Sequence, residues 1–125
     1  ALNSREDQRI RSKVYDAITD AFSGFDFMLS PTLAISPVKN LLNGETKVPT
    51  HINGIEIEPA IGWCLTFLIN FTGHPAASIP CGFTASKLPV GLQIIGKRHA
   101  DDKVLAFSKA FEKISPWAQS YPGNS

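Results

Sequence analysis

The sequence predicts an α/β domain in which helices cover both faces of a mixed β-sheet. Helical and strand-like stretches follow one another in the order α-β-loop-α-β-β-α. The central strand-like stretches lack a simple alternation of apolar and polar residues, which is typical of strands buried on both faces. A chain of 125 residues has the length of one domain, yet it cannot easily bury three strands on both faces. We therefore expect further protein to cover this sheet.

The first predicted element is an amphipathic helix over residues 4–22. Ser4 suits the N-cap, and the acidic residues just after it suit the positive end of the helix dipole. Four apolar residues at i+4 steps form one stripe: Ile10, Val14, Ile18 and Phe22. The next stretch, FDFMLSPT, predicts a short strand that ends at Pro31, because proline cannot continue a strand ladder.

Residues 33–57 are predicted to form a long loop excursion. They hold two prolines and two glycines and show little apolar periodicity. The dipeptide Asn53-Gly54 is typical of a tight turn and predicts a small hairpin inside the loop. Loops of this length are usually functional or belong to a larger architecture, and the sequence leaves open whether this one is a lid.

A second helix is predicted over residues 59–71. Pro59 is a favourable first helical residue, and Gly73 follows the expected end. The stretch is apolar almost all round, so we expect it to be buried on most sides.

Two strands and a helix are predicted in the rest of the chain. The strands cover residues 76–80 and 90–96, and Pro80 with Gly82 is expected to end the pairing of the first strand. The helix covers residues 101–114 and turns its apolar side chains inward.

The predicted domain organisation is a single partial domain over residues 1–125. Asp101 or Asp102 is expected to cap the last helix. Residues 115–125 form a tail that we expect to be frayed apart from Trp117.

Composition and charge narrow the possible partners and location. The net charge is +1 from 12 basic and 11 acidic residues, which form no basic stripe or acidic tail, so nucleic acid and anionic membrane are not expected partners. The longest mainly apolar stretch is interrupted by charges and a proline, which predicts a buried helix instead of a membrane span. No signal peptide is visible, which favours a cytoplasmic protein, and the missing initial Met suggests a chain cut from a longer one. Cys64 and Cys81 are predicted to be reduced, with one disulfide as the alternative.

The usual motifs of catalysis and cofactor binding are missing from the sequence. It has no Gly-x-Ser-x-Gly elbow, P-loop, Gly-x-Gly-x-x-Gly, His-Glu-x-x-His or Cys-x-x-Cys, so neither a cofactor nor a metal is predicted. His51, His74 and His99 could serve as ligands or bases, but their spacing favours locally satisfied histidines of loops or rims. Ser78 is placed like a nucleophile near a strand end, yet no base lies in register and a structural hydroxyl is favoured.

Three segments carry a family resemblance: FDFMLSPT, NFTGHPAASIPCGF and LPVGLQIIGKRHADDKVLAFSKAFE. In this order they resemble the C-terminal third of the amidase signature family. That pattern has a strand ending in Pro-Thr, an Asn-x-x-Gly-x-Pro segment, and Leu-Pro-x-Gly-x-Gln-x-x-Gly before a helix. The resemblance covers residues 9–112 and leaves the excursion over residues 33–57 unmatched.

The resemblance implies a hydrolase of carboxamide-type C–N bonds. The family works with a nucleophilic Ser, a bridging Ser in a cis peptide, and a Lys base whose pKa is lowered by burial and neighbours. Backbone N–H groups of a Gly-Ser-rich loop form its oxyanion hole. These parts lie in the N-terminal two thirds of the family, and this sequence contains neither the Gly-Gly-Ser-Ser-Gly-type run nor a matching Lys. The role implied for this chain is to complete the sheet and part of the acyl pocket.

The same resemblance points to three substrate-binding residues. In the family, the helix before NFTG borders the acyl pocket. Counting back from Asn70, Trp63 falls where the A subunits of glutamine-using tRNA amidotransferases carry an Asp that reads the substrate's amino group. The indole implies a less polar acyl group. Ala60 and Phe67 lie one turn to either side and share the face of Trp63 by helical geometry. An ordinary core position is the alternative for all three.

Two classes of function remain open. The chain is either the C-terminal part of an amidohydrolase, with the N-terminal remainder and a small amide substrate as partners, or a free-standing amidase-like module that binds without catalysis. A third reading is the A-type component of a tRNA amidotransferase, against which Trp63 argues. An exposed sheet edge would also allow the piece to self-associate as a homo-oligomer.

Overall fold

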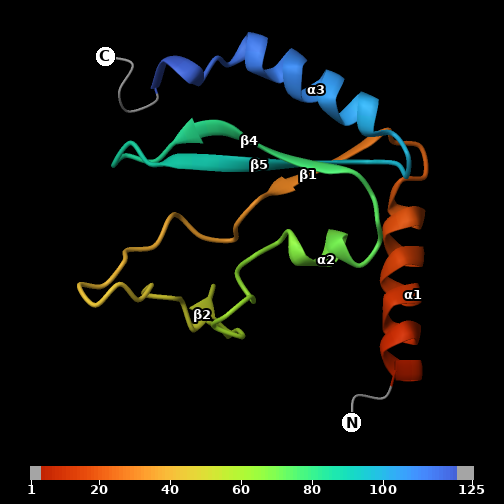
Figure 1. Ribbon diagram of the computed structural model, residues 1–125, viewed down its shortest axis with the longest axis horizontal. Coiled ribbons are helices and arrows are strands. Elements are labelled where there is room, and N and C mark those ends of the chain that lie inside the picture. The colour runs from red at the N-terminus through yellow and green to blue at the C-terminus, as the bar shows by residue number, and fades with distance from the viewer. Residues whose placement is uncertain (1–3, 121–125) are drawn as a thin grey trace.

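A computed structural model describes residues 4–120 of the chain. Its elements follow the chain in this order: α1 (Ser4–Ala21), β1 (Phe27–Pro31), β2 (His51–Ile52), β3 (Ile55–Glu56), α2 (Phe67–Asn70), β4 (Ala76–Phe83), β5 (Pro89–Gly96), α3 (Asp101–Ile114) and the 3-10 helix η1 (Ala118–Ser120). In Figure 1 the sheet lies between α3 on one side and α2 on the other, and α1 stands at one end. The α/β class with helices on both sides of the sheet is confirmed.

The main sheet has the strand order β1-β5-β4, so β5 is central. Both of its neighbours run antiparallel to it. The mixed pairing that the sequence predicts is therefore not found in the described part of the chain. Connectivity dictates this direction for β4 and β5, because a short hairpin joins them and can only link antiparallel strands.

Burial on both faces holds for β5 and fails for β4. Ile94 and Ile95 point to opposite faces of the sheet, yet they are 0% and 2% exposed. Side chains of β4 alternate between exposed and partly buried, as expected of an edge strand with one face toward solvent. The prediction of burial on both faces, drawn from the missing alternation in sequence, is thus correct for β5 and wrong for β4.

Strand β4 continues beyond the point where the sequence predicts its end. Pro80 pairs with Gly91, Gly82 with Val90 and the register shifts between Pro80 and Gly82, which marks a bulge at Cys81. Proline is tolerated here because β4 lies at the edge of the described sheet, where a missing N–H breaks no ladder. The prediction that Pro80 and Gly82 end the pairing is wrong.

The two faces of the sheet hold separate apolar contacts. On the face toward α1 and α2, Phe22, Ile69 and Ile95 form a buried cluster. Ile18 and Met28 pack against this cluster, whereas Ile10, from the predicted stripe, is 55% exposed. On the α3 face, the ring centroids of Phe27 and Phe107 lie 4.9 Å apart and Val104 is buried.

The predicted helix over residues 59–71 is wrong in its first two turns. Residues 59–66 form successive turns, and α2 begins only at Phe67. The backbone of this region also bonds to the chain that leaves β1: Ala34 N donates to Trp63 O, and Leu65 N donates to Thr32 O. Tertiary backbone pairing has replaced the helix that local composition favours.

Helix starts differ from the predicted caps. Ser4 is itself helical, and so are Asp101 and Asp102. Ala100 holds the N-cap of α3 without a side-chain hydrogen bond. The two aspartates are still placed favourably, because negative charge in the first turn faces the positive end of the helix dipole.

The excursion over residues 33–57 contains the predicted hairpin. His51–Ile52 pairs with Ile55–Glu56 in antiparallel register. Asn53 and Gly54 form the turn, and both have positive φ angles, 51° and 79°, as a type I′ turn requires. Among residues 4–120, no helix is both long and apolar enough to cross a lipid bilayer.

The predicted tail is described only in part. Trp117 is partly buried and residues 118–120 form η1. The remaining tail residues, 121–125, lie outside the described residues.

Candidate functional site

A row of polar side chains crosses the sheet on the face toward α2. Gln93 of β5 lies opposite Ser30 of β1 and Ser78 of β4, and residues paired in this way project from the same face. Gln93 is 3% exposed, and its Nε2 donates a hydrogen bond to Ser30 Oγ at 3.0 Å. A cavity of about 310 Å³ between α2 and the sheet has Ser78 and Gln93 in its wall. The sheet therefore presents amide and hydroxyl groups to a space beside α2.

A pair of hydroxyls extends this row toward the end of β1. The oxygens Thr32 Oγ1 and Ser78 Oγ lie 2.6 Å apart, within hydrogen-bond distance. The pair meets over Gly91, where an added Cβ would lie 2.6 Å from Thr32 Oγ1 and 3.0 Å from Ser78 Oγ. Only glycine leaves this contact undisturbed. The bond fits the structural role that the sequence favours for Ser78.

The turn that carries Trp63 is fixed beside Thr32. Ala34 N donates to Trp63 O at 2.9 Å and Leu65 N donates to Thr32 O at 3.2 Å, so the turn pairs with the chain that leaves β1. The indole is partly buried, and its Nε1 donates to Pro59 O at 2.9 Å. Hydrogen bonds to backbone groups thus hold both the carbonyl and the indole ring of Trp63.

Two further bonds tighten this turn. Gly62 N donates to Glu58 O at 2.7 Å and Cys64 N to Ile61 O at 2.9 Å. A Cβ at Gly62 would lie 2.8 Å from Glu58 O, so the tight turn excludes a side chain at this position. Rigid support of this kind is typical of side chains that must keep one orientation.

The three predicted substrate-binding residues do not share one face of a helix. Ala60 is exposed and lies in the turns, Trp63 is partly buried in the same turns, and Phe67 is the first residue of α2. The predicted common face assumed a helix that the chain does not form there. Their assignment to a substrate remains a prediction, and Trp63 is the residue that the turn holds most firmly.

The cysteines are free thiols, Cys64 partly buried and Cys81 exposed. The structure does not join them in a disulfide, and their reduced state stays a prediction. Within residues 4–120, no group of three or more His, Cys, Asp or Glu side chains is arranged to hold a metal ion.

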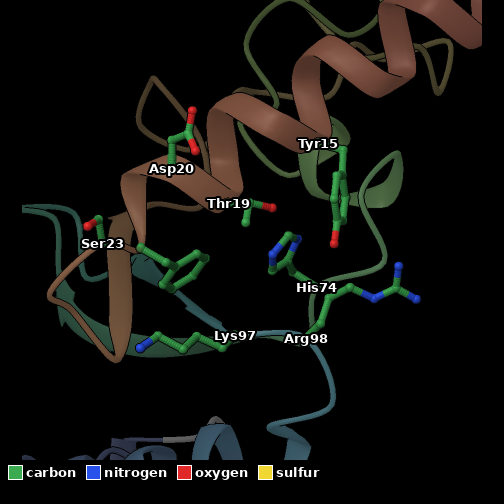
Figure 2. A pocket seen from close by; sticks show the side chains of 8 residues that line it. Tyr15, Thr19, Asp20, Ser23, His74, Lys97 and Arg98 are labelled. Atoms are coloured by element: carbon green, nitrogen blue, oxygen red, sulfur yellow. The ribbon is translucent and has the colours of Figure 1, made fainter.

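His74 lies in the loop between α2 and β4, as predicted, but it is buried and its Nδ1 has no hydrogen-bond partner among residues 4–120, so the predicted local satisfaction is wrong. It is 8% exposed, and its ring stacks on Phe22 with centroids 5.4 Å apart and an interplanar angle of 16°. Tyr15 lies on α1 with its centroid 5.8 Å from the same ring (Figure 2). The other two histidines match the prediction, since His51 and His99 are exposed. His51 Nδ1 lies 3.1 Å from Thr50 Oγ1.

The environment of His74 disfavours its charged form. Burial lowers the pKa of the imidazole below its ordinary value of 6.5, and the positive charge of Arg98 lowers it further. His74 is therefore expected to be neutral at neutral pH.

Acid should destabilise the fold through this histidine. Above about pH 6.5, His74 is neutral in both the folded and the unfolded chain, and no penalty arises. As the pH falls below 6.5, the unfolded chain takes up a proton that the folded chain resists. The free energy of unfolding should therefore fall until the pH passes the lowered pKa of the folded state. Urea unfolding at a series of pH values measures the slope of the free energy of unfolding against pH. The slope should be smaller in His74→Gln and unchanged in His51→Gln, the control at an exposed site. Identical slopes in the unchanged protein and both variants would contradict the prediction.

Sequence reasoning missed several residues of this region. Thr32 and Gln93 gain their partners from strands 46 and 63 residues away along the chain. The only available signal was their place in the strand-like stretches SPT and GLQ, which cannot show register. The burial of His74 depends on contact with α1, which no local pattern reveals.

Comparison with known proteins decides the family. The family model described as Amidase matches residues 2–105. This chain belongs to the amidase family.

Relatives of this amidase chain include enzymes of two kinds. It is 33% identical over 118 residues to an acylamidase of Rhodococcus erythropolis, covering 92% of this chain and 24% of the relative. It is 38% identical over 112 residues to the A-type component of the glutamyl-tRNA(Gln) amidotransferase of Thermotoga maritima, covering 90% of this chain and 21% of the relative. The amidase chain thus spans about a quarter or less of the length of these relatives.

Solved structures give the same picture. A bacterial aryl acylamidase of the amidase signature family matches with a TM-score of 0.87 and 51% identity, covering 94% of this chain and 24% of that one. The same amidotransferase component of Thermotoga maritima matches with a TM-score of 0.68 and 30% identity, covering 96% and 25%. The resemblance drawn from the three sequence segments is confirmed at the level of family and fold.

Proposed function

We propose that this chain is the C-terminal segment of an amidohydrolase that cleaves carboxamide-type C–N bonds by a Ser-Ser-Lys mechanism. In this role it completes the sheet and supplies part of the acyl pocket, while the triad comes from the N-terminal remainder. Support comes from the match to a bacterial aryl acylamidase at 51% identity over 94% of the chain. The substrate class that fits this match is an amide with an aryl leaving group.

Sheet completion is supported by the apolar surface of the two outer strands. Leu29 on β1 is 50% exposed, and Phe83 on β4 is 45% exposed. Large apolar side chains on strands whose outer edges are unpaired in the described sheet favour association with further protein. The proposed partners are accordingly the N-terminal remainder and a small amide, with no nucleic acid or membrane partner. A cytoplasmic location is part of the same proposal.

The observation that carries the acyl-pocket proposal is the anchored turn of Trp63. Its carbonyl binds Ala34 N, and Ala34 lines a cavity of about 240 Å³ together with Thr32 and Gly91. A bulky apolar side chain on such a rigid support can exclude acyl groups by shape. Because an indole carries no negative charge, it cannot form an ion pair with a charged amino group on the substrate.

Truncation of Trp63 should change acyl specificity more than stability. In the full-length enzyme, Trp63→Ala is expected to alter the ratio of kcat/KM between two anilides of different acyl length by about tenfold or more. The measurement compares anilides that share one leaving group, so that only the acyl part differs. Thermal unfolding of the same proteins reports stability.

Ile61→Ala is the matched control, because Ile61 lies in the same turns and is 51% exposed. It should leave the ratio unchanged. An unaltered substrate ranking in Trp63→Ala would remove Trp63 from the acyl pocket, and an equal change in Ile61→Ala would show a general loosening of the turn.

The A-type component of a tRNA amidotransferase is the second candidate, favoured by 38% identity to the Thermotoga maritima protein. Release of ammonia from glutamine by the full-length protein would support it, and hydrolysis of anilides without glutamine hydrolysis would support the amidohydrolase.

The non-catalytic module makes a different prediction. The 125 residues alone should then be monodisperse in size exclusion and should melt cooperatively, whereas an amidase segment should self-associate.

A further inference from the structure

The cavity of about 310 Å³ between α2 and the main sheet lies on the face that carries the polar row. Its walls hold uncharged polar side chains from both elements: Gln93 and Ser78 from the sheet, Thr66 and Asn70 from the side of α2. No Lys, Arg, Asp or Glu among residues 4–120 belongs to the wall. The cavity thus brings together amide and hydroxyl groups from segments that are far apart in sequence.

The carboxamide of Gln93 uses only part of its hydrogen-bonding capacity. Its Nε2 donates to Ser30 Oγ at 3.0 Å, on the side of β1, and no other hydrogen bond of this amide is found among residues 4–120. The two polar atoms of a carboxamide diverge from one carbon, so Oε1 turns away from β1 and toward β4. Gln93 is 3% exposed, yet Oε1 is not among the fully enclosed atoms that lack a partner. This oxygen is therefore a free acceptor that stays reachable from the cavity.

The wall on the side of α2 also has unused polar groups. Thr66 is partly buried and forms no side-chain bond that caps α2, and Asn70 is exposed. No side-chain hydrogen bond of either residue is found in the described part of the chain. A hydroxyl and a carboxamide each donate and accept hydrogen bonds. Free donors and acceptors thus line both walls of the cavity.

The surroundings of α2 indicate a protein surface as the neighbour. Leu68 of α2 is 40% exposed, and Phe71, directly after the helix, is 46% exposed. Figure 1 shows only the short helix α2 and the excursion on this side of the sheet, with α1 at one end. The chain covers 24% of the aryl acylamidase that it resembles, so most of such an enzyme lies outside this segment. Exposed apolar side chains beside unused polar groups are typical of a surface that packs against further protein.

We propose that the cavity beside α2 binds a backbone segment of the N-terminal remainder, with Gln93 Oε1 accepting a hydrogen bond from one of its peptide N–H groups. A peptide group matches these walls, because it brings one donor, one acceptor and no charge. Thr66 or Asn70 can then donate to the peptide carbonyl from the opposite wall. A charged ligand would lose its hydration here without gaining an ion pair. The partner exists only if the chain is the C-terminal segment of a longer amidase, as proposed above.

The test is hydrogen exchange of the full-length protein without substrate, measured peptide by peptide by mass spectrometry. Gln93→Met removes the acceptor and keeps a side chain of similar length. In this variant, one stretch of the remainder should exchange its backbone amides about tenfold faster or more, because an N–H group has lost a buried partner. Thr66→Val removes a hydroxyl and keeps the branched shape, so it should accelerate the same stretch and serves as the test if Gln93→Met does not fold.

Thr72→Val is the matched control. Thr72 is 3% exposed, as Gln93 is, and its Oγ1 donates to Ile69 O at 3.0 Å, but it does not line the cavity. Its replacement should accelerate exchange within this segment and leave the remainder unchanged. Equal acceleration of the remainder in Thr72→Val and Gln93→Met would overturn the proposal, since it would reflect a general loosening of the fold.

Two other occupants of the cavity give different results. If the cavity holds the amide of the substrate, Gln93→Met should raise KM for an anilide and leave exchange of the substrate-free protein unchanged. If it holds only water, neither KM nor exchange of the remainder should change. Either result would overturn the proposal. Faster exchange of the remainder in a full-length protein that hydrolyses no amide would support the docking of the backbone and contradict the proposed function.

Discussion

Replacing Ile94 with alanine is expected to lower the free energy of unfolding by about 3 kcal/mol. Ile94 is 0% exposed and lies in the central strand β5, where its side chain is enclosed between the sheet and α3. Removing its branched carbons leaves a cavity that the flanking strands cannot close, because β5 is paired on both edges. Urea unfolding of the full-length protein measures the change.

Ile114→Ala is the matched control for this prediction. The same side chain is deleted at the end of α3, where Ile114 is 84% exposed, and the expected change is within about 0.5 kcal/mol. Equal losses in the two variants would mean that Ile114 is buried by the remainder of the protein or that Ile94 is not the centre of this core.

The second large effect is expected at Gly96, the last residue of β5. An added Cβ would lie 2.6 Å from Val104 Cγ2, which is too close for two carbon atoms. Val104 is 3% exposed and β-branched, so its side chain cannot easily turn away. Gly96→Ala should therefore cost about 2 kcal/mol by forcing α3 away from the sheet.

A double-mutant cycle tests whether this contact is the cause. Val104→Ala removes the obstructing methyl groups, so Gly96→Ala should cost less in its presence, with a coupling energy of about 1 kcal/mol. Strictly additive losses in the double variant would show that Gly96→Ala acts through the backbone instead of through Val104.

These two residues connect the fold to the proposed role. Ile94 and Gly96 lie on the α3 face of β5, whereas Gln93 and Gly91 lie on the face of the polar row. A change on the α3 face should reduce stability, while Trp63→Ala should change acyl specificity. The strand thus separates the residues that support the sheet from those near the candidate site.

Elements with a strong local pattern were predicted well. The bounds 101–114 of α3 follow from its apolar spacing, and the hairpin at Asn53-Gly54 follows from a turn that needs two positive φ angles. The helix over residues 59–71 was mispredicted because its apolar composition favours any buried structure. Backbone bonds to Thr32 and Ala34 then favoured turns.

The candidate site was less accessible to sequence than the fold. Trp63 was selected by its distance from Asn70, and that choice remains a prediction, but the helical face proposed for Ala60 and Phe67 failed with the helix itself. The pair formed by Thr32 and Ser78 requires the register of two strands to be known.

Patterns read along the chain were enough to predict the α/β class, the family resemblance and two neighbouring strands, of which the structure makes one central. The need for further protein around the sheet stays a prediction. These properties follow from composition and from local motifs. The folded chain was needed to show which hydroxyls meet over Gly91, how the turn of Trp63 is held and that His74 is buried beside Arg98. Each of these depends on contacts between segments far apart in sequence, and such contacts are set by strand register and helix placement instead of by local preference.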